Sequence, residues 1–274
     1  MHVYVVAEIG INHNGSLETA EELIRTAKRG GADAVKFQKR TIELCYTPAE
    51  LAKPRESPFG TTNGDLKRGL EFSYDQYQQI DRICNEVGIE WSASPWDVPS
   101  VHFLAQMSVP WLKVPSALLT NDELLQACVR TGIPIWLSTG MSTEREINRA
   151  CDLANPAVLF HCHSAYPSPI EELNLSYLQF IDDLAGFPCD CRIGYSSHTT
   201  SPWPCLMAVC LGARVVEAHL TLDRTLFGSD QAASLEPHAF EKLVTEIRTF
   251  ERAYGDGVKR VWPSELPAKE KLRR

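Results

Sequence analysis

The chain has 274 residues, a formal net charge of −8 and an apolar fraction of 44%. This composition supports a sizeable core and excludes intrinsic disorder, and without a basic cluster before the final KEKLRR we expect no nucleic-acid partner. No apolar run reaches about 18 residues and the N-terminus lacks the features of a secretory leader, so we expect a cytoplasmic protein with no membrane partner. The nine cysteines are then expected to be reduced thiols.

Short apolar runs alternate with amphipathic runs along the whole chain. The runs predict parallel β-strands buried on both faces, at residues 3–8, 33–38, 89–93, 111–114, 134–138, 157–162, 191–195 and 214–219. Helices are expected between them, with Ser16 as an N-cap and Thr143 and Glu146 as a capping box. Eight strand–helix units are typical of a single-domain (β/α)8 TIM barrel. The first strand leads into EIGINHNGS, which lacks the glycine pattern of a dinucleotide-binding fold.

The domain organisation predicted from these patterns is simple. Residues 1–255 are expected to form the barrel, with an insertion at 39–73 that is rich in Pro, Gly and Thr and lies at the barrel mouth. Residues 256–274 are expected to be a C-terminal tail.

Polar residues collect at the carboxyl ends of the predicted strands, where barrel enzymes carry their chemistry. In chain order they are Glu8, Lys36, Gln38, Ser92, Ser94, Lys113, Ser116, Ser138, Ser164, Tyr166, Ser196, His198, Glu217 and His219. A lysine inside an apolar strand needs a counter-ion or an anionic ligand, which Glu8 and Glu217 or a bound phosphate or carboxylate would supply. Two histidines that follow adjacent strands indicate a divalent-metal site. The HCH at 161–163 and the CDC at 189–191 lack zinc-ligand spacing and are expected to be structural.

Several motifs, taken in order, resemble those of the sialic acid synthase family, the phosphoenolpyruvate-condensing N-acetylneuraminate synthases. The motifs are AEIGINHNGSLETAEELI, GADAVKFQ, STGM, HCHSAYPSP, GYSSHTTSP, EAHLTLDR and GSDQAASLEP, and the resemblance runs from about residue 3 to residue 252. It implies a C–C bond-forming transferase that acts on phosphoenolpyruvate and an aldehyde sugar. It also implies a homodimer, because an appended domain of one subunit reaches the other subunit's site in this family.

The resemblance also implies roles for individual residues. His198 and His219 would bind a divalent metal, with Mn²⁺ expected and Mg²⁺ or Co²⁺ as alternatives. The phosphoenolpyruvate positions are Lys36, Lys113, Ser116, Ser196 and Tyr166, and Ser94 and Ser164 are two further substrate-binding positions. Glu8 matches an active-site acid, and Gln38 and Asp230 match positions beside the acceptor sugar. Ser94 stands where the family usually has Thr, and Ser164 where it usually has Asn.

The acceptor is the part that the resemblance fixes least. The chain ends at Arg274, so we expect a catalytic barrel without the C-terminal antifreeze-like domain of full-length members. N-acetylmannosamine or a related aldose would give a 3-deoxy-2-keto sugar acid and phosphate, and we expect N-acetylmannosamine itself to be a poor acceptor. One alternative is a related ulosonate synthase for a phosphorylated aldose, because the insertion carries Lys53, Arg55, Lys67 and Arg68. Another is a metal-dependent aldolase on the same barrel.

Overall fold

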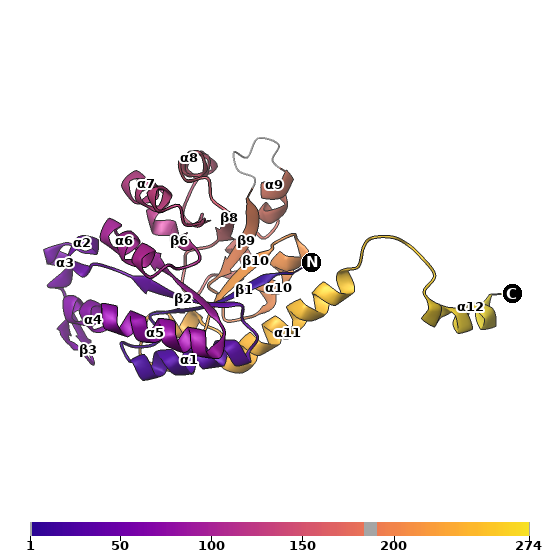
Figure 1. The fold of residues 1–274 in the computed structure, drawn as a ribbon, viewed down its shortest axis with the longest axis horizontal. Coiled ribbons are helices and arrows are strands. Elements are labelled where there is room, and N and C mark those ends of the chain that lie inside the picture. The colour runs from indigo at the N-terminus through magenta and orange to yellow at the C-terminus, as the bar shows by residue number, and fades with distance from the viewer. Residues whose placement is uncertain (1, 184–190, 274) are drawn as a thin grey trace.

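The computed structural model describes residues 2–183 and 191–273, and its centre is an eight-stranded parallel sheet that closes almost completely into a barrel (Figure 1). The strands are β1 (Tyr4–Gly10), β2 (Ala34–Lys39), β5 (Glu90–Pro95), β6 (Leu112–Val114), β7 (Ile135–Ser138), β8 (Val158–Cys162), β9 (Arg192–Ser197) and β10 (Val215–His219). Their order is β5-β2-β1-β10-β9-β8-β7-β6. Across the seam between β5 and β6, the Ser92 hydroxyl donates a hydrogen bond to the carbonyl of Trp111. All eight predicted strands and the predicted TIM barrel are confirmed.

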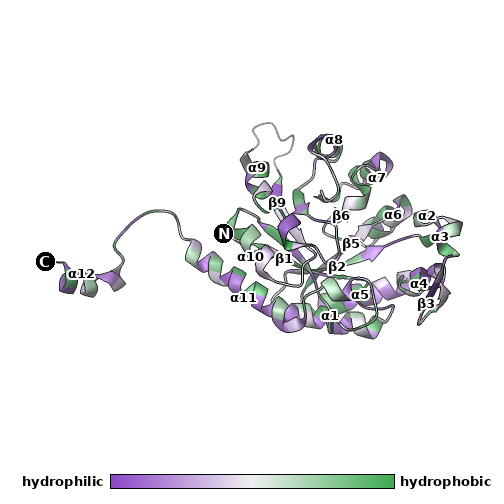
Figure 2. Cartoon of the chain, turned by 180° about the vertical axis from the view of Figure 1, so that it is seen from behind, coloured by the Kyte–Doolittle hydropathy of each residue, from purple (hydrophilic) through white to green (hydrophobic). Residues whose placement is uncertain are grey.

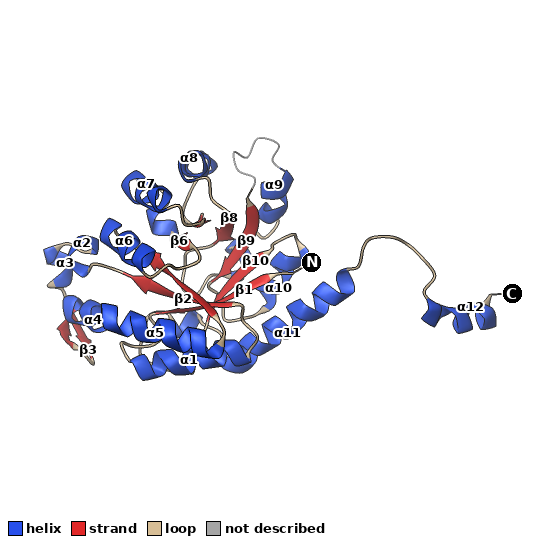
Figure 3. Cartoon of the chain, in the orientation of Figure 1, coloured by secondary structure: helices blue, strands red, loops and turns tan. Residues whose placement is uncertain are grey.

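Helices surround the barrel (Figure 3). The longer ones are α1 (Leu17–Arg29), α5 (Tyr74–Val87), α6 (Val98–Gln106), α7 (Asp122–Thr131), α8 (Glu144–Ala154), α9 (Tyr177–Asp183), α10 (Trp203–Cys210) and α11 (Pro237–Tyr254). Ser16 caps α1 by accepting from the backbone N–H of Thr19, and Thr143 and Glu146 form the predicted capping box. Hydrophobic and hydrophilic residues both appear on α1, α5 and α11 (Figure 2), whose apolar faces pack on the barrel wall.

The apolar core has two layers because side chains alternate across each strand. Outward-facing residues such as Val5, Ala7 and Val35 belong to the large cluster under the helices. Inward-facing residues fill the lower part of the barrel: Val6, Ala34, Trp111, Trp136, Val158, Phe160 and Val215. The indoles of Trp111 and Trp136 stack with centroids 3.9 Å apart. We call these seven residues the lower layer.

The insertion after β2 is folded. It contains α2 (Ile42–Cys45), α3 (Pro48–Leu51), the hairpin of β3 (Pro54–Ser57) and β4 (Gly60–Thr62), and α4 (Asn63–Gly69). It packs on the loop after β1, where a Cβ on Gly15 would lie 2.1 Å from the carbonyl oxygen of Gly69. Only glycine fits there, because Gly15 also has a φ of +72°. The insertion therefore stands beside the mouth and is anchored to it by backbone contact.

The chain leaves the barrel after α11. Residues 255–273 are exposed and run away from the barrel as an extended segment followed by η4 (Pro263–Glu265) and α12 (Leu266–Leu272) (Figure 1). Three further 3-10 turns are η1 (Ser116–Leu118), η2 (Ile170–Glu172) and η3 (Gln231–Ala233). Within the described ranges, no helix has the length and apolar character needed to cross a membrane.

Candidate active site

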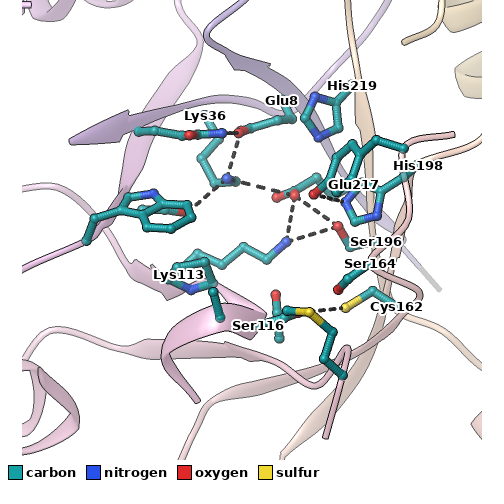
Figure 4. Close-up of a pocket in the computed structure, with 18 residues that line it drawn as sticks. Glu8, Lys36, Lys113, Ser116, Cys162, Ser164, Ser196, His198, Glu217 and His219 are labelled. Atoms are coloured by element: carbon teal, nitrogen blue, oxygen red, sulfur yellow. Dashed lines mark hydrogen bonds and ion pairs between the residues drawn. The ribbon is translucent and has the colours of Figure 1, made fainter. Parts of the chain in front are cut away.

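A cavity of about 180 Å³ opens at the carboxyl ends of the strands (Figure 4). Every barrel strand contributes to its wall, through Glu8, Lys36, Ser94, Lys113, Ser138, Cys162, Ser196 and Glu217. Six of the seven lower-layer residues are followed two residues later by a residue that lines the cavity, as Val6 is by Glu8 and Ala34 by Lys36. The seventh, Val158, is followed by Phe160 of the same layer. Strand periodicity thus places the polar residues above the apolar plug.

Four buried charges form the floor of the cavity. Lys36 Nζ lies 2.7 Å from Glu8 Oε2 and 3.9 Å from Glu217 Oε1, and Lys113 Nζ lies 2.6 Å from the same Glu217 oxygen. All four side chains are at most 4% exposed. Two ammonium groups and two carboxylates balance each other, which offsets the several kcal/mol per ion that burial of an isolated charge costs. Figure 4 shows both lysines and Glu217 converging on one point.

The environment moves the pKa values of these groups in different directions. Burial raises the pKa of Glu8, so this carboxyl binds a proton more readily than a free one. Burial also opposes the charge of Glu217, but Lys113 and Lys36 outweigh it and lower the pKa of Glu217. Burial lowers the pKa of Lys113, whereas for Lys36 the two carboxylates overcome burial and raise the pKa. The two carboxyls are therefore chemically distinct.

Hydroxyl groups gather on the wall beside Lys113. Ser196 Oγ lies 3.2 Å from Lys113 Nζ, and Ser116 Oγ accepts a hydrogen bond from the Gly140 N–H. A Cβ on Gly140 would lie 2.2 Å from Ser164 Oγ and 2.9 Å from Ser116 Oγ. Glycine is required at this position of the STGM motif because the two hydroxyls meet the backbone there. The result is a set of hydrogen-bond donors suited to a small anion.

The rings of the two histidines lie close together beside Glu217, with centroids 5.4 Å apart (Figure 4). His198 Nδ1 is 2.5 Å from the carbonyl oxygen of His163, which can only accept, so Nδ1 carries the proton. His198 Nε2 then faces the cavity, where it meets the Tyr166 hydroxyl at 2.9 Å. Burial, with His219 nearby, lowers the pKa of His198 to about 3, which keeps the imidazole neutral. A neutral imidazole held by a backbone carbonyl is the form that binds metals.

Whether this pair fits a divalent metal can be tested on the donor atoms. His219 Nδ1 is buried and has no hydrogen-bond partner among the described residues, and the nearest carboxylate oxygen, Asp230 Oδ2, is 4.0 Å away. Across residues 2–183 and 191–273, no group of three or more His, Cys, Asp or Glu is arranged to hold a metal. The chain thus offers two nitrogen ligands, and an ion bound there would complete its shell with water and substrate oxygens. The residues present fit such an ion.

The structure brings nearly all of the predicted site residues together. Glu8, Lys36, Gln38, Ser94, Lys113, Ser116, Ser164, Tyr166, Ser196, His198 and His219 all line the cavity. Asp230 does not line it and lies behind His219 at its edge. Glu217, expected as a counter-ion for the lysines, has that position.

Five lining residues were not predicted as site residues: Trp96, Pro115, Ala117, Met141 and Cys162. Cys162 places its sulfur 3.3 Å from Ser116 Oγ, and Trp96 and Met141 form apolar walls. The two-residue step from Phe160 to Cys162 along an inward-facing strand was the available signal for the cysteine. No periodic signal exists for Trp96 and Met141, because both follow the last residue of a strand.

The HCH motif at 161–163 and the CDC motif at 189–191 were predicted to be structural. His161 Nε2 lies 2.8 Å from the Leu173 carbonyl oxygen, and His163 contacts Ser168 and Glu172. These two histidines are held by protein groups, as a structural role requires, and Cys162 faces the cavity instead. The CDC motif begins at residue 189, and Cys189 and Asp190 lie outside the described residues.

Comparisons with known proteins point in one direction. The model of the NeuB family matches residues 23–259. The N-acetylneuraminate-9-phosphate synthase of Homo sapiens is 42% identical over 98% of this chain and 76% of that protein. The N,N'-diacetyllegionaminic acid synthase of Legionella pneumophila is 36% identical over 100% of this chain and 79% of that protein. The pseudaminic acid synthase of Campylobacter jejuni strain 81-176 is 32% identical over 93% and 76%.

Solved structures show the same architecture. The N-acetylneuraminic acid synthetase of Leptospira borgpetersenii, solved with citrate, superposes with a TM-score of 0.85 at 30% identity and covers 100% of this chain and 93% of that one. A truncated 3-deoxy-D-arabino-heptulosonate 7-phosphate synthase from Thermotoga maritima has a TM-score of 0.68 at 12% identity, over 94% of this chain and 90% of that one. The latter likeness concerns the fold alone.

Proposed function

From the premise that this chain belongs to the NeuB family of C–C bond-forming synthases, we propose that it condenses phosphoenolpyruvate with an aldehyde sugar. C3 of phosphoenolpyruvate bonds to the aldehyde carbon, the oxygen of a water molecule adds at C2, and the phosphate leaves. The products are a 3-deoxy-2-keto sugar acid of the sialic acid type and inorganic phosphate. The observation that carries the proposal is the pair of buried lysines at the floor of the cavity, beside a wall of hydroxyls.

The donor fits the floor of the cavity. Phosphoenolpyruvate has a phosphate and a carboxylate, and Lys36 and Lys113 would each contact one of them. Ser94, Ser116, Ser164 and Ser196 would donate the remaining hydrogen bonds. Ser94 Oγ already lies 3.0 Å from Lys36 Nζ, and Ser196 Oγ lies 3.2 Å from Lys113 Nζ. Fixed charges and donors of this kind hold the reacting carbon in place and stabilise the charge that develops on it.

The acceptor would lie above the donor, near the histidines. A divalent ion held by His198 and His219, Mn²⁺ in our prediction, would polarise the aldehyde oxygen as a Lewis acid. Tyr166, through its hydroxyl beside His198 Nε2, would orient that end of the acceptor. Gln38 and Asp230 would receive the sugar hydroxyls.

Glu8 would accept a proton from the water that adds at C2. Its raised pKa suits this role, since a carboxyl that binds protons more readily is the better base. Gln38 Nε2 donates to Glu8 Oε1 at 3.1 Å and thereby orients the carboxyl. Glu217, whose pKa is lowered, stays charged and holds both lysines in place.

Two acceptor classes suit this reaction, an unmodified and a phosphorylated aldose. Condensation adds three carbons at C1 of the acceptor, so position 9 of a nine-carbon product is position 6 of a six-carbon acceptor. The human relative named above is a 9-phosphate synthase, whereas the legionaminic and pseudaminic acid synthases are not named for a phosphate. N-acetylmannosamine and its 6-phosphate are therefore the first acceptors to try.

Release of inorganic phosphate tests the proposal. The protein is mixed with phosphoenolpyruvate, Mn²⁺ and either N-acetylmannosamine or its 6-phosphate, and phosphate is measured together with the keto acid. We expect equal amounts of both products, and both should require the sugar. A metal-dependent aldolase would release no phosphate, so C–C bond formation without phosphate would contradict the proposal. Sedimentation of the same sample tests the predicted homodimer.

A further inference from the structure

A second cavity, of about 230 Å³, lies beside the mouth, where the insertion meets the loop before η3. Arg55 and Lys67 of the insertion line one side of it, and Gly228 and Ser229 line the other. Arg40, at the start of the insertion, is close enough to influence the charge of Lys67, as is Arg55. We call Arg40, Arg55 and Lys67 the flanking cations.

The flanking cations have no carboxylate partner within 4.0 Å in the described part of the chain. Neighbouring cations on the same insertion do, since Lys39 Nζ lies 2.6 Å from Glu71 and Arg68 Nε lies 3.1 Å from Glu43. Among the described residues, the one hydrogen-bond acceptor of the Arg55 guanidinium is the amide oxygen of Asn63, at 3.4 Å. The insertion thus neutralises some of its cations and leaves these three together.

Like charges this close repel one another, and the Asp230 carboxylate offsets only part of that repulsion at Lys67. Lys67 is half-buried over the ring of Tyr46, and burial together with Arg40 and Arg55 lowers its pKa. The Nε of Arg40 is buried and makes no hydrogen bond to any described residue. Repelling cations with unused donors are complementary to a doubly charged ligand, and phosphate is the group that such donors bind best.

The flanking cations are connected to the candidate active site on two sides. Arg40 donates to the Gln38 side chain and lies over the Trp96 ring, 4.4 Å from its centroid, and both of these residues line the main cavity. On the other side Ser229 Oγ donates to Asp230 Oδ1 at 2.7 Å, and Asp230 in turn faces His219. A sugar whose aldehyde lies at the histidines would therefore extend past Asp230 toward Lys67.

We propose that the flanking cations bind a phosphate group at the far end of the acceptor, so that the sugar substrate is a phosphorylated aldose. This rests on the proposed function, because it takes the main cavity to hold the aldehyde end. The phosphate stays intact in this step. It is a binding group, and the phosphate released in the reaction is that of phosphoenolpyruvate.

The experiment compares N-acetylmannosamine 6-phosphate with N-acetylmannosamine, each with phosphoenolpyruvate and Mn²⁺, in the unmodified chain and in Lys67→Met and Arg55→Met. We expect the unmodified chain to prefer the phosphorylated sugar. Each variant should lower kcat/KM for that sugar by about tenfold to a hundredfold, as loss of a charge-assisted hydrogen bond does. Values for N-acetylmannosamine and the KM of phosphoenolpyruvate should not change.

Arg68→Met is the matched control, because it removes a cation of the same insertion that is already paired with Glu43. It should leave both sugars unaffected. Equal kcat/KM for the two sugars in the unmodified chain would overturn the inference and leave the proposed function standing. An equal loss for both sugars in Lys67→Met, or the same loss in Arg68→Met, would overturn it too.

Failure of the proposed function is separable from failure of this inference. If neither sugar yields phosphate and keto acid, the proposed function is wrong. Calorimetry then measures binding of the two sugars to the same proteins, without turnover. Tighter binding of the phosphorylated sugar that is lost in Lys67→Met and kept in Arg68→Met would still support a phosphate site, and equal binding of the two sugars would overturn it.

Discussion

The lower layer and the charged floor directly above it come from the same strands and differ in what they do. A step of two residues along a strand separates the layers, from Val6 to Glu8, Ala34 to Lys36, Trp111 to Lys113, Trp136 to Ser138, Phe160 to Cys162 and Val215 to Glu217. Below, large apolar side chains fill the barrel and the two indoles stack. Above, buried ions face a cavity of about 180 Å³.

The difference shows how one barrel separates stability from function. Close-packed aromatic groups, such as the stacked indoles of Trp111 and Trp136, stabilise the fold through burial beneath the cavity. The ions above contribute little net stability, because their attraction is offset by lost hydration. Their fixed positions instead provide a preorganised electrostatic environment that stabilises a bound anion. Changes in the lower layer should therefore alter stability, and changes above it should alter activity.

The largest expected effect is on turnover. His219→Ala and His198→Ala should each lower kcat by about a thousandfold, because removal of a principal electrostatic stabiliser has that magnitude. The free energy of unfolding should stay close to that of the unmodified chain, since neither side chain belongs to the apolar core. Phosphate release, metal content after dialysis and denaturant unfolding measure the three quantities. Full activity in the presence of a chelator would contradict the metal assignment.

Trp136→Ala tests the lower layer. It should decrease the free energy of unfolding by about 3–5 kcal/mol, the range for truncating a buried aromatic residue. In the folded fraction the KM of phosphoenolpyruvate should be unchanged, because Trp136 does not line the cavity. Trp262→Ala is the control, since that indole is 55% exposed on the tail and its loss should leave stability unaltered. If Trp136→Ala greatly changed the KM of phosphoenolpyruvate and left the free energy of unfolding unaltered, the assignment of the lower layer to stability would be wrong.

Lys36→Met and Lys113→Met test the floor. Each should raise the dissociation constant of phosphoenolpyruvate by about tenfold to a hundredfold, from the 1.5–3 kcal/mol of about one charge-assisted hydrogen bond. Lys39→Met is the matched control, because Lys39 lies on the same strand but pairs with Glu71 outside the cavity. Titration calorimetry measures these dissociation constants. An unchanged affinity for phosphoenolpyruvate in Lys36→Met or Lys113→Met would refute the role assigned to that lysine.

Gly140→Ala should have a smaller effect on the same ligand. The new methyl group would displace the Ser164 and Ser116 hydroxyls, and loss of one neutral hydrogen bond raises KM by about threefold to tenfold. In a Ser164→Ala background the added effect of Gly140→Ala should shrink, because the hydroxyl it meets first is gone. Steady-state kinetics of the four proteins check this, and fully additive effects would count against it.

The last expected effect is a difference in pH dependence outside both layers, which is absent above pH 6.5. Burial lowers the pKa of His13 to about 3 from the ordinary 6.5, so folding favours the neutral ring, which stacks on Phe72 at 4.1 Å. The contribution of the His13 ring to the free energy of unfolding is present above pH 6.5 and is lost as the pH falls toward 3. His13→Gln should therefore show a flatter decline of unfolding free energy over this range. Denaturant unfolding at a series of pH values measures it, and parallel curves would rule it out.

The sequence by itself determined the strands, their inward faces and nearly the whole set of cavity residues. Apolar runs of strand length predict all eight strands because burial on both faces leaves a local signature. Alternation along a strand then decides which side chains point inward, and the fold decides that they meet at the carboxyl ends. The motifs added Asp230, which no periodicity would have placed beside His219.

The tertiary structure alone decided which carboxylate pairs with which lysine. Glu217 pairs with Lys113 across 104 positions of sequence, and this depends on strand register and barrel closure rather than on any local pattern. The sequence showed the insertion only as a segment rich in Pro, Gly and Thr that carries several cations. Its folding pairs Arg68 with Glu43 and leaves Lys67 beside the loop before η3. Lys67 and Arg68 are adjacent and carry the same charge, but their neighbours differ because those neighbours belong to elements that are remote in sequence.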